Sequence, residues 1–134
     1  VTTLELDRIA EEFIRSHGAV PGFLGYGGFP NTLCVSVNEN VVHGIPSNYA
    51  LREGDIVKID VGAFYKGYHG DAARTIPVGK VSEEAEKLIR VTRESFFAGI
   101  EKLQVGNRLG DVGHAINAHV VANGFNKIKK YIVH

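Results

Sequence analysis

The stretch from Val57 to Pro77 most constrains how this chain can fold, because it holds two strand-like runs on either side of a Lys66-Gly67 turn signal. In the first run, alternate apolar residues fall on one face, which is typical of a half-buried strand. The second run can return antiparallel to the first. Each run carries one aspartate, Asp60 and Asp71. The sequence therefore predicts an antiparallel hairpin with a carboxylate on each strand.

The position of the turn decides how the two aspartates meet. A turn centred just before Lys66 places Asp60 directly opposite Asp71, and a turn centred just after Lys66 makes them diagonal neighbours. Both registers put the carboxylates on one face, because strand side chains repeat every two residues. Their Cβ atoms would be about 5 Å apart in the first register and roughly 7–8 Å apart in the second.

Two carboxylates at this separation repel each other unless a cation lies between them. Hard divalent cations prefer carboxylate oxygens, so Asp60 and Asp71 are candidate metal ligands. The alternative is a surface hairpin whose two aspartates are simply solvated. A register that placed them on opposite faces would remove the metal hypothesis.

Composition narrows the remaining function classes. A length of 134 residues predicts a single domain, 1–134, with a sizeable core. The 15 basic and 15 acidic residues form no basic block, which argues against nucleic acid and anionic membranes as partners. We expect no membrane span, because no apolar run approaches about 18 residues. The single cysteine, Cys34, fits a reducing, cytoplasmic compartment.

Capping and periodicity predict the other elements. Thr2 and Glu5 form a capping box for a first helix that ends near Gly18, and Ser82 is a good N-cap for a second helix. Further segments are expected as a strand over Thr32–Val37, a helix from about Leu109 to Ala122, and a last strand over Phe125–Val133. The absence of methionine and the start at Val1 suggest a trimmed piece of a longer protein.

Two further segments are candidates for a binding site. The glycine-rich and aromatic segment Pro21–Pro30 is either an ordered turn or a pocket wall made by Phe23, Tyr26 and Phe29. His43 is followed by Gly44, which permits close approach of another backbone. A histidine in this setting is either structural or functional.

Several motifs in this order resemble the type I methionine aminopeptidases, bacterial members in particular. They are Cys34–Glu39, His43-Gly44-Ile45-Pro46, Gly54–Val57, Ile59-Asp60-Val61, His69-Gly70-Asp71, Leu109–Val112 and Gly124-Phe125. The resemblance runs over essentially the whole chain. It implies an α/β (α+β) pita-bread fold of the creatinase/aminopeptidase type, here incomplete, with an antiparallel sheet and flanking helices.

The resemblance also implies a function and a site. The family removes the N-terminal methionine of nascent proteins with water activated by two divalent ions, cobalt, manganese, iron or zinc. The resemblance implies that Asp60, Asp71 and His134 are metal ligands. It also implies that His43 is the catalytic histidine that contacts the scissile peptide. Phe23, Tyr26, Phe29 and Cys34 would enclose the methionine side chain, since aromatic and sulfur groups suit a thioether. The expected partners are methionyl peptides, and the expected state is a monomer.

The chain departs from the family pattern in ways that affect this expectation. It stops before the family's second histidine and its two glutamate ligands, and Val133 stands where the family has glycine. We therefore expect at most one bound ion and no activity from this chain alone, unless a C-terminal half complements it. The alternatives are a non-catalytic pita-bread binding module, a structural or engineered fragment, and a proline-specific relative of the same fold.

Overall fold

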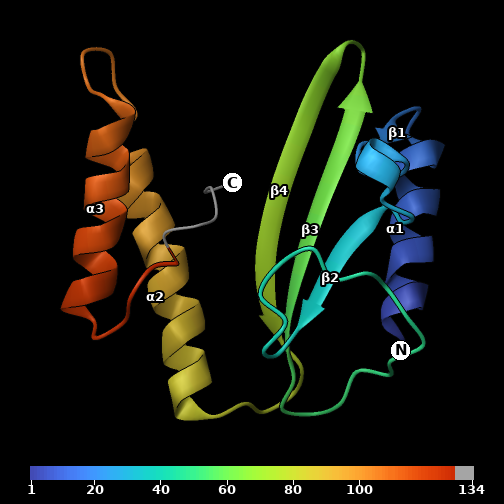
Figure 1. Cartoon of the computed structure of the whole chain (residues 1–134), viewed down its shortest axis with the longest axis horizontal. Helices are drawn as coiled ribbons and strands as arrows, with labels where there is room; N and C mark the ends of the chain where they lie inside the picture. The colour runs from blue at the N-terminus through green and yellow to red at the C-terminus, as the bar shows by residue number, and fades with distance from the viewer. Residues whose placement is uncertain (129–134) are drawn as a thin grey trace. The chain divides into compact units, whose positions relative to one another are not determined.

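A computed structural model of the protein describes residues 1–128. They belong to two compact units, residues 1–81 and the residues from Ser82 onward, and each is described by itself. The first unit holds a helix, a 3₁₀ turn and a four-stranded sheet (Figure 1): α1 (Thr3–Ser16), β1 (Val20–Pro21), η1 (Tyr26–Gly28), β2 (Leu33–Val37), β3 (Ile56–Tyr65) and β4 (Tyr68–Pro77). The second holds α2 (Glu83–Ile100) and α3 (Leu109–Ala122).

Strand β3 is the centre of the sheet. It pairs antiparallel with β4 along one edge and with β1 and β2 along the other. The β3–β4 turn is made by Lys66 and Gly67, whose φ angles are 49° and 88°. Two successive positive φ angles are typical of the two-residue type I′ turn, whose twist matches that of paired strands. The predicted hairpin and its turn are confirmed.

Helix α1 covers one face of the sheet. It begins as predicted, with the Thr2 hydroxyl accepting from the Glu5 backbone N–H and the Glu5 carboxylate accepting from Thr2 N–H. Its residues Leu6 and Ala10 pack against a buried apolar cluster on the sheet, made by Leu33, Val35 and Val57. Because these three positions are odd-numbered, the even-numbered side chains of β2 and β3 point to the opposite face.

A buried carboxylate joins α1 to the start of β2. Asp7 accepts hydrogen bonds from the backbone N–H groups of Thr32 and Leu33, at 2.9 and 2.7 Å, and from the Asn31 side chain at 2.8 Å. Only 6% of Asp7 is exposed. This helix residue therefore satisfies the two backbone donors that open the strand, where unpaired N–H groups would be costly.

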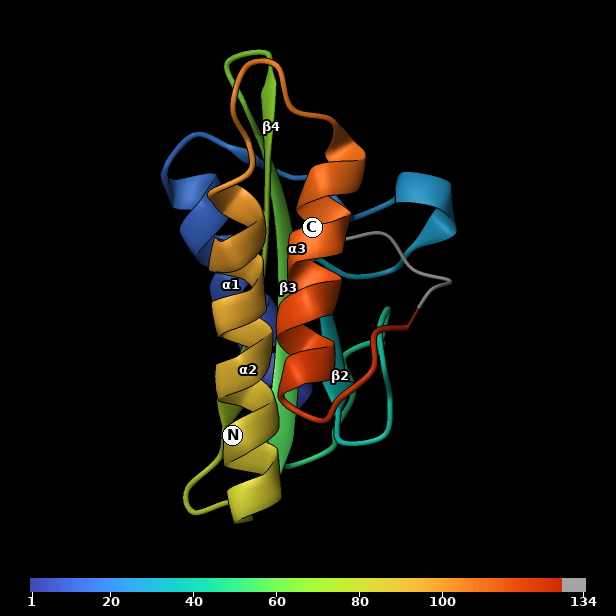
Figure 2. The ribbon, with the colours of Figure 1, turned by 90° about the vertical axis from the view of Figure 1, so that its left-hand side faces the viewer.

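In the second unit, α2 and α3 lie side by side (Figure 2). Ser82 caps α2 as predicted, since its hydroxyl accepts from Ala85 N–H at 3.2 Å. The Glu94 carboxylate on α2 lies 3.1 Å from Nε2 of His119 on α3. The predicted third helix is confirmed, but residues 125–128 form no strand, so that part of the predicted last strand is wrong. Residues 129–133 lie outside the described residues.

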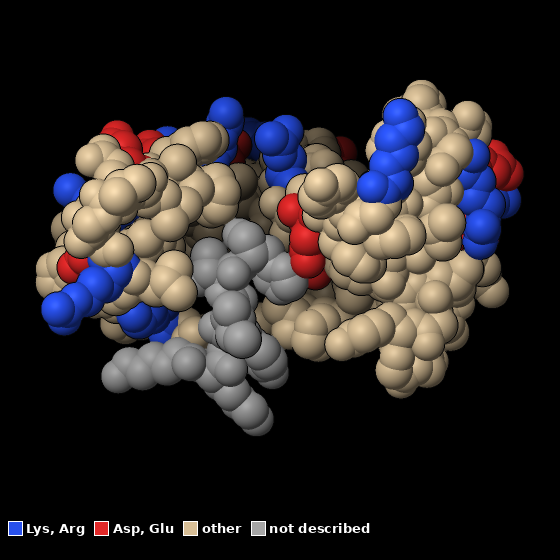
Figure 3. Space-filling view, turned by 90° about the horizontal axis from the view of Figure 1, so that it is seen from above, with Lys and Arg blue, Asp and Glu red and all other residues tan. Residues whose placement is uncertain are grey.

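The described surface agrees with the balanced charge of the sequence. On the face drawn in Figure 3, Lys and Arg side chains are scattered among uncharged residues and form no continuous basic patch in the coloured part. Within residues 1–128, no helix combines the length and apolarity that crossing a bilayer requires.

Candidate metal and substrate site

The hairpin register brings Asp60 and Asp71 onto one face of the sheet. Asp60 is paired with Ala73, and Asp71 is paired with Gly62, so the two aspartates are diagonal neighbours. This is the second of the two registers that the sequence allows. Diagonal neighbours have Cβ atoms roughly 7–8 Å apart, which is within the reach of two carboxylates toward one ion. The prediction that both carboxylates share a face is confirmed.

Cys34 joins the aspartates on this face. It is the β2 partner of Asp60 and is only 6% exposed. Burial raises the pKa of the Cys34 thiol to about 11, and the negative charges of Asp60 and Asp71 add to the rise. The thiol is therefore protonated at neutral pH, which suits an apolar contact better than metal ligation or nucleophilic attack. The strand pairing places the three side chains in one neighbourhood, because Cys34 is paired with Asp60 and Asp71 is a diagonal neighbour of Asp60.

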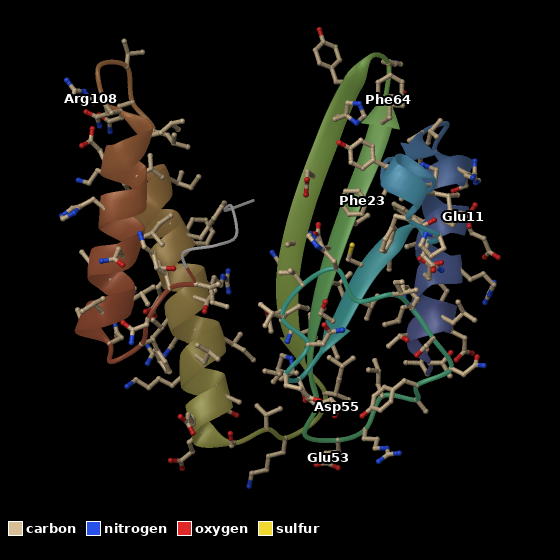
Figure 4. All side chains as sticks on the ribbon, viewed as in Figure 1. Glu11, Phe23, Glu53, Asp55, Phe64 and Arg108 are labelled. Atoms are coloured by element: carbon tan, nitrogen blue, oxygen red, sulfur yellow. The ribbon has the colours of Figure 1, made fainter. Side chains whose placement is uncertain are left out.

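Phe23 lies against the same strand face, where β3 has a glycine. A Cβ built on Gly62 would lie 2.5 Å from Cε1 of Phe23, so the ring occupies the space of a side chain at position 62. Figure 4 shows Phe23 beside β3, between the hairpin tip near Phe64 and the far end near Asp55. The segment is fixed by a 2.7 Å hydrogen bond from Gly22 N–H to the Gly62 carbonyl. Phe23 is thus a wall of this face, next to the position that pairs with Asp71.

The other aromatic candidates lie on or next to η1. Tyr26 is 82% exposed, and Phe29 is half-buried. The turn is closed by hydrogen bonds from Tyr26 N–H to the Phe23 carbonyl and from Gly25 N–H to the Phe29 carbonyl, at 2.9 and 2.8 Å. The same short loop therefore carries all three rings. Their convergence near His43 remains a prediction.

His43 lies on the loop that follows β2. Its side chain is exposed, and its φ of 57° is unusual for a residue with a side chain. The beginning of the loop is held by Asn38, whose side chain donates to Asp55 at 2.9 Å and accepts from Ile56 N–H at 2.9 Å. Asp55 also accepts from the Tyr49 hydroxyl and from Arg52 N–H, and these hydrogen bonds lower its pKa, the Arg52 contact most.

Asp60 and Asp71 fit a divalent metal ion by their chemistry. Both are acidic oxygen donors from adjacent strands, which is the type of ligand that hard cations prefer. Within residues 1–128, no group of three or more His, Cys, Asp or Glu side chains forms a metal site. The third predicted ligand, His134, lies outside the described residues. Asp60 and Asp71 would thus be the contribution of the first unit to a metal centre.

Sequence reasoning missed three residues that shape this site: Ser36, Asp55 and Gly62. Gly62 interrupts a strand pattern, a signal that often marks close approach by another group, and it could have been read. Asp55 also carries a signal, because aspartate commonly accepts hydrogen bonds from nearby backbone. Nothing in the sequence distinguishes Ser36, whose hydroxyl accepts a hydrogen bond from Gly44 N–H at 3.0 Å because the following loop folds back onto β2.

Known proteins were compared with this chain. The model of metallopeptidase family M24 matches residues 1–134. A methionine aminopeptidase of Clostridium perfringens is 58% identical over 134 residues, which are 100% of this chain and 54% of that protein. Solved methionine aminopeptidases of Thermotoga maritima and Rickettsia prowazekii are 45% and 40% identical. Both have TM-scores of 0.95, and both alignments cover 98% of this chain and 53% of theirs.

These similarities agree with the fold and the site. The chain spans about half the length of the relatives that it matches. The predicted pita-bread fold, an antiparallel sheet with flanking helices, is confirmed by the two solved structures. Because the family model matches the whole chain, this protein belongs to metallopeptidase family M24.

Proposed function

We propose that the protein containing this chain is a methionyl aminopeptidase that removes N-terminal methionine from peptides. The observation that carries the proposal is the diagonal placement of Asp60 and Asp71 on one sheet face, with Cys34 beside them. Relatives named methionine aminopeptidase, among them one that is 58% identical, support the substrate class. The paired aspartates argue against a non-catalytic binding module, which has no need to hold two like charges together.

Asp60 and Asp71 would hold the divalent ions, with His134 proposed as a further ligand. Cobalt, manganese, iron and zinc are the candidate metals. Bound ions would supply Lewis acidity and lower the pKa of a water molecule. Two carboxylates offset the charge of one divalent ion, so we expect Asp60 and Asp71 to hold one ion more tightly than a second.

His43 is the proposed catalytic histidine of this chain. A histidine N–H that donates to the scissile peptide's carbonyl oxygen would stabilise the negative charge that develops there. The imidazole is exposed on its loop and therefore accessible to a peptide. Phe23, Tyr26, Phe29 and Cys34 are the proposed contacts of the methionine side chain. The protonated Cys34 thiol and the Phe23 ring are soft, uncharged groups, and such groups suit a thioether.

The test uses the protein expressed from its complete reading frame. With manganese or cobalt present, we expect release of methionine from a peptide that begins Met-Ala, and none from the same peptide with N-terminal leucine. Loss of activity on chelation and recovery on metal addition should accompany it. A protein that cleaves Xaa-Pro dipeptides instead would be a proline-specific relative. A folded, metal-loaded protein that cleaves neither substrate would be a binding module.

We further propose a cytoplasmic, monomeric protein. The single buried cysteine supports a reducing compartment.

A further inference from the structure

His43 has a backbone conformation that needs support from its surroundings. Its φ of 57° lies in the left-handed region, which a non-glycine residue rarely adopts. Such a conformation is disfavoured and persists only where neighbouring contacts hold it. The residue that follows, Gly44, makes those contacts with β2.

Gly44 is fastened to β2 by two hydrogen bonds. Its N–H donates to the Ser36 hydroxyl at 3.0 Å, and its carbonyl accepts from Val35 N–H at 2.8 Å. A Cβ on Gly44 would clash with the Val35 carbonyl oxygen, so the loop backbone touches the strand backbone directly. Ser36 is only 1% exposed, and its contact with Gly44 is therefore shielded from competing water.

Ser36 also lies close to the site along the strand. It is two residues from Cys34, the partner of Asp60, and both side chains are on the same face. A strand rises about 3.3 Å per residue, so Ser36 and Cys34 are separated by roughly 7 Å. The hydroxyl thus fixes the loop that carries His43 at a set distance from the Asp60 carboxylate.

We propose that Ser36 is a positioning residue for His43: its buried hydroxyl holds Gly44 N–H and thereby orients His43 toward the substrate at the carboxylate pair. This inference rests on the proposed catalytic role of His43. Since small displacements of a catalytic group can cost up to about 10²-fold in rate, loss of the hydroxyl should lower kcat. It should leave KM nearly unchanged, because the contacts of the methionine side chain are elsewhere.

The experiment is a double-mutant cycle in the protein expressed from its complete reading frame. We expect Ser36→Ala to lower kcat about tenfold, and Ser36→Thr, which keeps the hydroxyl, to restore most of it. In a His43→Ala background, Ser36→Ala should have almost no further effect, since residues that act through one group are non-additive. Amide exchange at Gly44 should also become faster in Ser36→Ala.

Thr32→Val is the matched control. Thr32 lies just before β2, is 0% exposed, and its hydroxyl has no hydrogen-bond partner among residues 1–128. Its near-isosteric replacement should leave kcat and Gly44 exchange unchanged. An equal loss of kcat from Ser36→Ala with and without His43, or unchanged Gly44 exchange, would overturn the positioning role. A wild-type protein without methionyl-peptide hydrolysis would instead overturn the proposed function, and the inference with it.

Discussion

The ring of Phe23 occupies the space into which a side chain at Gly62 would project, with Cε1 of the ring 2.5 Å from a Cβ built there. Gly62 is the β3 partner of Asp71, so this relationship ties the aromatic loop to the carboxylate pair. A side chain at position 62 and the present ring position exclude each other. The contact between Phe23 and Gly62 therefore sets how closely the aromatic loop approaches the sheet face that carries the two aspartates.

Gly62→Ala should displace the Phe23 ring and weaken methionyl substrates. A change of one methyl group in a side-chain pocket is typically worth about 1–3 kcal/mol, so kcat/KM should fall about tenfold or more. The metal content should not change. The matched control is Gly70→Ala, on β4, where an added Cβ meets nothing within 4 Å. Equal kinetics for the two variants would contradict the role of Gly62.

Tyr26→Ala should raise KM for methionyl peptides and leave folding and metal content unchanged. At 82% exposure the ring contributes little to the core, so an effect on kinetics would report contact with substrate. Tyr68→Ala is the control. Tyr68 is 80% exposed and lies at the hairpin tip, on the sheet face opposite to the one that carries the two aspartates. Normal turnover by Tyr26→Ala would remove Tyr26 from the pocket.

Asp60→Asn and Asp71→Asn should each reduce divalent metal binding by at least about tenfold, because each removes an anionic oxygen ligand. Calorimetric titration with manganese measures the effect. Glu12→Gln removes a carboxylate from α1 whose side chain is 64% exposed, and it should leave the titration unchanged. Tight binding that survives the replacement of both aspartates would show that the metal is held elsewhere.

Asp55→Asn should flatten the acid side of the stability profile. Folding lowers the pKa of Asp55. The ionised carboxylate therefore stabilises the fold fully when the pH is above the pKa of Asp55 in the unfolded chain, near 4. That contribution is lost as the pH falls through the lower pKa of the folded state. Chemical denaturation at pH 7 and below pH 4 measures the difference. The neighbouring Glu53→Gln is the charge-matched control (Figure 4). If the free energy of unfolding falls no more steeply with acid in the wild-type protein than in Asp55→Asn, the lowered pKa of Asp55 is contradicted.

Asp7→Ala should lower the free energy of unfolding by about 3 kcal/mol, because it leaves the Thr32 and Leu33 N–H groups without their acceptor in a buried setting. Urea denaturation provides the measurement. Glu11→Ala removes an exposed ion pair with Arg15 on the same helix and should cost under about 1 kcal/mol. A similar small loss for both variants would show that the strand start does not depend on Asp7.

Local pattern was sufficient for the parts of the fold that depend on neighbouring residues. The turn signal at Lys66-Gly67 and the alternation in β3 predicted the shared face of Asp60 and Asp71. The Thr2–Glu5 capping box and the Ser82 N-cap likewise predicted where α1 and α2 begin. The strand expected from Phe125 onward is wrong over residues 125–128, because two apolar residues in four are too weak a pattern to distinguish a strand from a loop.

Contacts between distant segments were beyond the reach of the sequence. Asp7 serves β2 from 25 residues away, and Gly44 reaches Ser36 by folding its loop back onto the strand. Neither pairing leaves a periodic signal, since each depends on one side chain meeting one backbone group. The contact between Phe23 and Gly62 could be predicted only in part. A glycine within a strand indicates that another group approaches closely, but it does not identify that group.

The tight turn of the β3–β4 hairpin also bears on the order of folding events. Asp60 and Asp71 meet through closure of one short loop, and hairpins of this kind form within about 1–10 μs. Their pairing does not wait for α1 or for the loop that carries His43, both of which need slower closure of longer segments. We therefore expect the two like charges to become neighbours as soon as the hairpin closes, when solvent still screens them most effectively.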